Sequence, residues 1–204
     1  MKPIDPSKYR RPVTIQQMGS SPSVWTDALG HIVMVAVTPQ GSTLEHPELR
    51  SHKVELRYRP TPQVAPGMRI LDGSRILYIR SVADVEERHV EWQLKCYEPI
   101  LDLTADIQRN QSSTLDIGQT TETWASILTN GPVPCGMMAP SSALAQQYAE
   151  LIGVQQVSIF RFTLGQDVQP ADRIVTQSTT WTVHAQLFPE SFPITTDVFA
   201  SKIG

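Results

Sequence analysis

The feature that most constrains the fold is an alternation of apolar and charged residues between Val54 and Val82, in VELRYRPTPQVAPGMRILDGSRILYIRSV. In its first part, Val54, Leu56 and Tyr58 alternate with charged residues, the pattern of a half-buried strand. Further on, MRILDGSRILYIRSV places an Asp-Gly pair between two apolar runs. Such a pair favours the positive φ angles of a type I′ turn. The segment therefore predicts antiparallel sheet, with a stiff, proline-rich connector, RPTPQVAPG, between strand and hairpin.

Neighbouring segments supply further strands. VTIQQM, from Val13, alternates in the same way, and the apolar run from His31 to Val37 predicts a strand buried on both faces. Residues 38–52 are broken by Gly41 and Pro47, which predicts a loop with at most a short helical turn. A further hairpin is expected to place four residues on one face: Val90, Trp92, Leu94 and Cys96. About six antiparallel strands in 98 residues favour a small barrel or sandwich.

The second half of the chain repeats features of the first. Trp25 and Trp124 stand 99 residues apart in similar surroundings. Beyond them a constant offset of 104 aligns three pairs: Arg57 with Arg161, Arg69-Ile70 with Arg173-Ile174, and Leu77 with Trp181. We therefore expect an all-β chain of two tandem barrels, residues 1–98 with an N-terminal arm and residues 99–204 with a divergent copy. Two unrelated β domains are the alternative.

One segment of the second half predicts a short helix. In APSSALAQQYAELIG, Ser141 or Ser142 can cap the helix and Gly153 can end it. The apolar residues between them recur at helical spacing: Leu144, Tyr148, Leu151 and Ile152.

Charge and composition indicate no particular partner. The formal charge is -3, from 17 Lys and Arg against 20 Asp and Glu. Residues 1–98 carry 13 basic against 11 acidic residues (net +2), and residues 99–204 carry 4 against 9 (net -5). No run of about 18 apolar residues or signal-like leader is visible, so a soluble product of a reducing cytoplasm is expected.

The residues that carry chemistry form no catalytic pattern. His46 and His52 flank a loop with Glu45 and Glu48, but this spacing is a weak metal signal, and exposed loop residues are the favoured interpretation. Cys135 lies in an expected strand and is interpreted as an inert buried thiol. We expect no enzyme activity, no catalytic residue, no metal and no cofactor.

Basic residues are the main candidates for contacts with other molecules. The N-terminal PSKYRRP is either an arm that binds an acidic or phosphate-bearing surface or a solvated tail. Arginines on outward strand faces protect sheet edges and also serve interfaces. The candidates for a ring interface or for docking to an adaptor are Tyr9, Arg10, Arg11, Arg57, Arg59, Arg75 and Arg80.

Residues 11–98 resemble the bacteriophage head-tail joining family, also called head-closure or stopper proteins. The resemblance rests on VELRYRP followed by GMRILDGSRILYI, and on the order of strands around them. In the second half it rests only on the internal repeat.

The resemblance implies a structural protein of the virion neck, assembled in the host cytoplasm, with no membrane partner. Its partners would be copies of itself in a ring, a portal-adaptor ring above, tail terminator or tail tube proteins below, and packaged DNA in the channel. We expect six chains in preference to twelve, and stacked barrels in preference to alternating ones.

In this family a long loop projects into the channel, and here it corresponds to Thr38–His52. The closure candidates are Gln40, Gly41, Ser42, Thr43, Leu44, Glu45, His46, Glu48 and Arg50. Alternatives are a tail-terminator or tail-completion ring protein and, less favoured, an accessory β protein that binds carbohydrate or a host surface.

Overall fold

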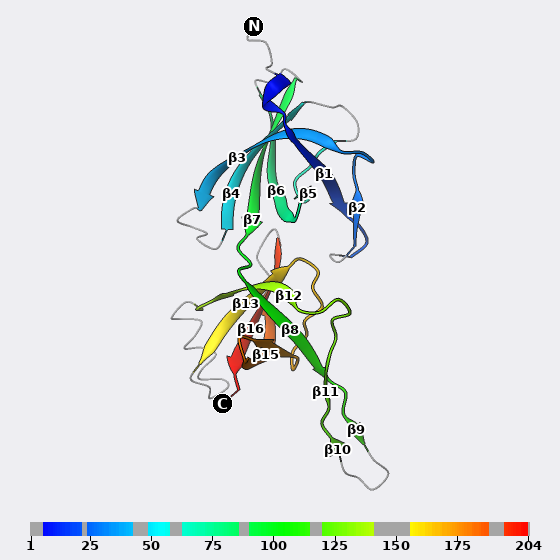
Figure 1. The fold of residues 1–204 in the computed structure, drawn as a ribbon, viewed down its shortest axis with the longest axis vertical. Coiled ribbons are helices and arrows are strands. Elements are labelled where there is room, and N and C mark those ends of the chain that lie inside the picture. Colours follow the sequence, from blue (N-terminus) through cyan, green and yellow to red (C-terminus); the bar gives the residue numbers. More distant parts are fainter. Residues whose placement is uncertain are drawn as a thin grey trace. The chain divides into compact units, whose positions relative to one another are not determined.

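The computed structural model describes residues 6–21, 24–42, 49–57, 63–85, 90–114, 120–140, 156–187 and 194–203. The chain divides into two units, residues 1–100 and 101–204. Each unit is a closed, six-stranded antiparallel β-barrel with one additional short strand (Figure 1). The expected all-β fold with two tandem barrels is confirmed, and the boundary lies close to the one inferred from the sequence.

The first barrel follows a short 3-10 turn, η1 (Pro6–Lys8). Its strands are β1 (Arg11–Met18), β2 (Trp25–Asp27), β3 (Val33–Ser42), β4 (Leu49–Arg57), β5 (Arg69–Asp72), β6 (Arg75–Asp84) and β7 (Glu91–Pro99). Their order is β2-β1-β3-β4-β7-β6-β5, and a β1–β5 pairing closes the barrel.

Strand β1 achieves closure by changing partner along its length. Arg11 to Val13 pair with β3, Thr14 to Gln16 pair with β5, and Gln16 to Met18 pair with β2. Its burial alternates accordingly, with Val13 and Ile15 buried. The core inside the barrel is continuous and contains inward-facing residues from every strand that closes it.

The second barrel repeats this plan. Its strands are β8 (Leu103–Asn110), β11 (Trp124–Ser126), β12 (Val133–Met138), β13 (Val157–Thr163), β14 (Arg173–Thr176), β15 (Thr179–Leu187) and β16 (Thr195–Lys202). Their order is β11-β8-β12-β13-β16-β15-β14, closed by β8–β14. A separate two-stranded sheet, β9 (Ser113–Thr114) with β10 (Thr120–Thr121), lies between β8 and β11.

Particular residues show that the two barrels are copies of one design. Ile15 pairs with Ile70 where Ile107 pairs with Ile174, and all four are fully buried. A β-bulge interrupts the β6–β7 ladder between Ile79 and Ser81, and another interrupts β15–β16 between Val183 and Ala185, 104 residues later. Buried Leu77 and Trp181 are equivalent as expected.

A cation–π contact is also repeated. The guanidinium of Arg69 lies 4.2 Å from the ring centroid of Trp25, and that of Arg173 lies 3.6 Å from the ring of Trp124. In each barrel this contact joins the short additional strand to the strand that closes the barrel. The equivalence of the two tryptophans, expected from the sequence, is confirmed.

Four expectations need correction. Arg57 is not the equivalent of Arg161. Arg161 pairs with Gly136 of β12 and with Asp197 of β16. The equivalent position in the first barrel is Glu55, which pairs with Ala36 of β3 and with Gln93 of β7.

The run from His31 to Val37 is not buried on both faces. Val33 and Val35 are buried, but Ile32 and Met34 are 65% and 48% exposed, because only one face of β3 lines the core.

Much of the expected loop 38–52 is strand. The β3–β4 ladder continues through a bulge to Gly41↔Ser51 and Ser42↔Arg50, so Pro39 and Gly41 are accommodated by the bulge instead of ending the strand. Residues 43–48, and the expected helix at 141–153, lie outside the described residues.

The two central hairpins use different turns. Asp72 pairs with Arg75, and of the two residues between them Gly73 has a positive φ of 63° and Ser74 does not. This is the φ pattern of a type II′ turn, not the type I′ turn expected from Asp-Gly. In the second barrel Thr176 pairs with Thr179, and Gln177 and Ser178 have φ values of 48° and 62°. That hairpin therefore has the type I′ pattern without glycine or asparagine.

Replacing Gln177 with Asn and Ser178 with Gly should stabilise the second barrel by about 1 kcal/mol, because these residues adopt positive φ at lower cost. Denaturant unfolding of the full chain, followed by circular dichroism, measures the change.

The matched control is Gly73→Ala in the first barrel. No atom lies within 4 Å of the Cβ it would add, so its expected cost of about 1 kcal/mol comes from φ alone. An unchanged or lowered stability for the Asn-Gly variant would contradict the turn assignment.

Candidate functional site

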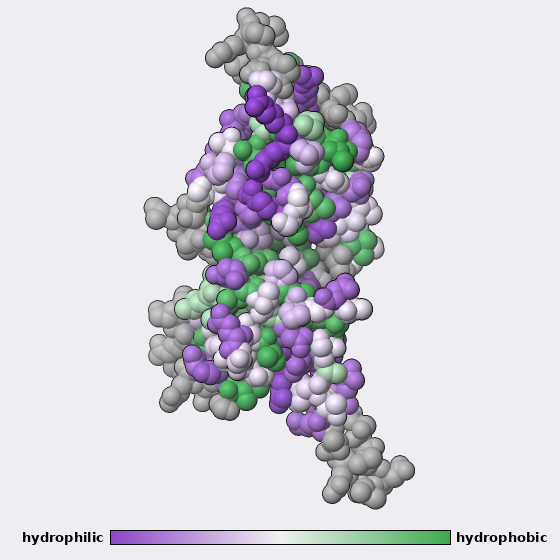
Figure 2. All heavy atoms as spheres, viewed as in Figure 1, coloured by the Kyte–Doolittle hydropathy of each residue, from purple (hydrophilic) through white to green (hydrophobic). Residues whose placement is uncertain are grey.

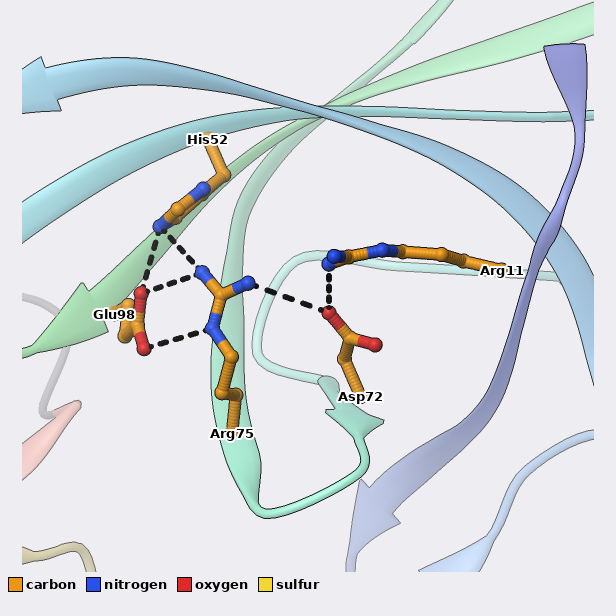
Figure 3. A network of polar contacts seen from close by, with 5 residues as sticks. All are labelled: Arg11, His52, Asp72, Arg75 and Glu98. Carbon is orange, nitrogen blue, oxygen red and sulfur yellow. Dashed lines mark hydrogen bonds and ion pairs between the residues drawn. The ribbon is translucent and has the colours of Figure 1, made fainter.

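One polar cluster of the first barrel contains five side chains from five strands (Figure 3). We call it the polar network; its members are Arg11 (β1), His52 (β4), Asp72 (β5), Arg75 (β6) and Glu98 (β7). Strand alternation places them on the inward face, because His52 is two residues before buried Val54 and Glu98 is two residues after buried Cys96. Asp72 and Arg75 flank the β5–β6 turn, so the network lies where the apolar core ends.

Arg75 is the centre of the network. Its Nε and Nη2 donate to the two carboxylate oxygens of Glu98 at 3.0 and 2.8 Å, a bidentate pair. Its Nη1 lies 3.5 Å from Oδ2 of Asp72, and Nη1 of Arg11 donates to the same oxygen at 2.6 Å. His52 Nε2 lies 2.8 Å from Glu98 Oε2 and 3.3 Å from Arg75 Nη2.

The network is electrostatically balanced, with two guanidinium groups facing two carboxylates. The hydrogen bond from Arg75 lowers the pKa of Glu98 below its usual value, and the same bond raises the pKa of Arg75. His52 is 2% exposed, and its Nδ1 is buried without a hydrogen-bond partner. The contacts join strands that are distant in sequence, so the network ties the end of the barrel together.

The second barrel lacks this network. The pairing registers place Leu103, Ser158, Thr176, Thr179 and Lys202 at the positions of the five members. Thr176 Oγ1 instead donates to the Thr104 carbonyl at 2.8 Å. The two copies therefore share a scaffold but differ in chemistry at this end.

The N-terminal residues that are described lie against the first barrel. Tyr9 is buried, and its hydroxyl donates to Glu91 at 2.7 Å. Burial and this bond raise the pKa of Tyr9 to about 12. Lys8 forms ion pairs with Glu55, at 3.1 Å, and with Glu91. Hydrophilic side chains gather over η1 and the start of β1 in Figure 2. From Pro6 onward the segment is therefore neither a free arm nor a solvated tail.

Among the described residues, the interface candidates lie in different surroundings. Tyr9, Arg11 and Arg75 have the partners within the barrel given above, and Arg75 does not lie on an outward strand face. Arg10, Arg57 and Arg80 are exposed, with Arg80 at the β-bulge and Arg57 5.9 Å from the Tyr9 ring centroid. Arg59 lies outside the described residues.

Some of the closure candidates lie in strands, and the others lie outside the described residues. Gln40, Gly41 and Ser42 belong to β3 and Arg50 belongs to β4. Arg50 pairs directly with Glu98 of the polar network across the β4–β7 ladder. The rest lie outside the described residues: Thr43, Leu44, Glu45, His46 and Glu48.

Residues that could carry chemistry are dispersed. Within the described ranges, no group of three or more His, Cys, Asp and Glu is placed to hold a metal ion. Cys96 and Cys135 are fully buried free thiols, and burial raises their pKa values to about 12 and about 11. His46 and His89 lie outside the described residues. In the described part of the chain, no helix is long and apolar enough to cross a membrane.

Sequence reasoning missed three members of the network, although a signal existed. The loop pattern predicts an exposed residue at His52, with a metal ligand as the weaker alternative, but His52 is buried in β4. The sequence pattern predicts no site role for Asp72 or Glu98. Each stands two residues from a buried apolar residue on its own strand. A charged residue at an inward position near a strand end is the signal for such a cluster.

No protein-family model, curated protein or solved structure matches this chain.

Glu98→Gln should destabilise the first barrel by about 1–2 kcal/mol at neutral pH, because Arg75 loses the carboxylate that it binds through two hydrogen bonds while remaining partly buried. Denaturant unfolding of the full chain measures this. Glu122→Gln is the control, since Glu122 is exposed and its removal should change stability by less than about 0.5 kcal/mol. Equal effects of the two substitutions would contradict the stabilising role of the network.

The pH dependence has a defined sign. Because the folded-state pKa of Glu98 is depressed, its contribution is fully present above the unfolded value of 4.5 and is lost as pH falls through the folded value. The difference in stability between the parent and Glu98→Gln should therefore shrink below about pH 4. A difference that grows on acidification would refute this assignment.

Proposed function

We propose that this chain is a structural ring subunit of the neck of a tailed bacteriophage, which joins head to tail and helps to close the DNA channel. The observation that carries the proposal is the duplication of a closed six-stranded barrel along one chain. The residues that resemble the head-closure family fall on its central elements, with VELRYRP at the end of β4 and GMRILDGSRILYI across the β5–β6 hairpin.

A closed barrel suits a load-bearing ring subunit. Each of its six strands is hydrogen-bonded on both sides, so neighbouring molecules meet its outer faces and connections instead of adding strands to it. Arg10, Arg57 and Arg80 are exposed, and we propose that they contribute to such contacts. Copies of itself, a portal-adaptor ring and tail terminator or tail tube proteins are the proposed neighbours.

The duplication also bears on copy number. Six chains supply twelve similar barrels, which offers a route between twelve-fold and six-fold rings. Because only the first barrel contains the polar network, the two barrels are not interchangeable. This difference favours six chains with stacked rings over a ring in which both barrels alternate.

The proposal is tested by locating the protein in particles. Antibodies raised against the purified chain, detected with gold in electron micrographs of phage released by cells that carry the gene, should label the junction of head and tail. Label at the far end of the tail, or no labelled particle, would contradict the proposal.

Closure is tested by replacing residues 43–48 with Asn-Gly. The β3–β4 ladder already reaches Ser42↔Arg50, so the barrel should keep its strand content by circular dichroism. Particles that contain the variant should lose packaged DNA, measured as nuclease-sensitive genome per particle. Full DNA retention would show that this connection does not close the channel.

A further inference from the structure

The second barrel carries a β-ribbon that the first barrel lacks. We call it the arm and define it as residues 111–114 and 120–123, which include β9 and β10. It continues the β8–β11 ladder, because Trp124 pairs with Asn110, Gln111 N donates to the Thr123 carbonyl at 2.8 Å, and Thr121 pairs with Ser113. Figure 1 shows this ribbon extending away from the strands of its own barrel.

The first barrel provides a direct comparison. There Met18 pairs with Trp25 as Asn110 pairs with Trp124, and Gly19 N donates to the Val24 carbonyl at 2.8 Å. Six residues join Met18 to Trp25, whereas 13 residues join Asn110 to Trp124. The extra seven residues are not needed to close the barrel, since the first barrel closes without them.

The arm presents backbone groups that need partners. In the described part of the chain, β9 and β10 pair only with each other, so each has one open edge of N–H and C=O groups. An isolated two-stranded ribbon is at best marginally stable in water. Its sequence is QSST and TTET in the described ranges, rich in the strand-forming residue Thr and without the Lys or Pro residues that commonly protect an edge.

Charge bears on the choice of partner. Residues 99–204 carry 9 acidic and 4 basic residues, so the net charges of two copies of this half repel each other. β9 and β10 contain no charged residue; the charged residues of the stretch 111–123 are Glu122 in the arm and Asp116 between the arm's two ranges. Identical strands without charge can pair without opposing like charges. With no Lys or Arg, the arm has nothing to bind a phosphate backbone.

We propose that the arm pairs edge to edge with the arm of a second copy of this chain, so that the two ribbons join into one sheet. The pairing satisfies backbone groups that are open in the single chain and brings together strands that contain no charged residue. This inference goes beyond the proposed function and does not depend on it, because it concerns self-association of the isolated chain.

The chain itself supplies the best variant. Replacing residues 111–123 with a copy of residues 19–24 gives the second barrel the short connection of the first, and the matching Met18–Trp25 and Asn110–Trp124 registers make the exchange compatible with the fold. Light scattering during size-exclusion chromatography should give a mass of two or more chains for the parent and of one chain for the variant. A parent that is monomeric, or a folded variant that retains the parent's association, would overturn the proposal.

Disulfide trapping tests the contact in chains that keep the arm. Chains with Ser113→Cys, chains with Thr121→Cys, and a mixture of the two should form a covalent dimer in at least one case on mild oxidation, because a disulfide requires Cα atoms within about 7 Å. Native Cys96 and Cys135 are fully buried and should not contribute. Ser20→Cys, in the exposed short connection of the first barrel, is the control. No dimer above the level of this control would also overturn the proposal.

Discussion

Both barrels depend on a single strand that exchanges partners along its length. In the first barrel, eight residues of β1 pair in turn with β3, β5 and β2. In the second, β8 pairs in the same way with β12, β14 and β11. Without the middle segment of each strand the sheet would be open, with two unprotected edges and a core exposed between them. The inward residues Ile15 and Ile107 lie at this segment and are fully buried.

On this common scaffold the two copies differ in one polar cluster and in one connection between strands. The cation–π contacts of Arg69 with Trp25 and of Arg173 with Trp124 are retained, because they fasten the additional strand beside the closing pair. The polar network is confined to the first barrel and the arm to the second. The first barrel therefore has an end that is cross-linked by ion pairs between two guanidinium groups and two carboxylates. The second barrel has a ribbon whose strand edges carry open backbone N–H and C=O groups. If the chain forms a ring as proposed, these differences would allow its two barrels to contact different neighbours.

The sequence allowed the fold to be predicted far better than the site. Alternation around Val54 and Leu56 and the Asp-Gly hairpin gave antiparallel strands, and the paired tryptophans gave the repeat. The wrong pairing of Arg57 with Arg161 has a simple cause. The true offset is 106 at β4 and β13 and 104 at β5 and β14, and a slip of two residues leaves the alternation of a strand unchanged. The sequence does not predict the polar network, because its charge favours an outward position for Arg75, whereas Arg75 is two residues before buried Leu77 and lies on the inward face.

The most direct test of this account is the closure of each barrel, observed in the full chain by nuclear magnetic resonance. Interstrand nuclear Overhauser effects between the backbones of Ile15 and Ile70, and between those of Ile107 and Ile174, report the β1–β5 and β8–β14 pairings. The account predicts both sets of contacts. Their absence in either half, with the other ladders intact, would mean an open sheet there and would contradict a tandem pair of closed barrels.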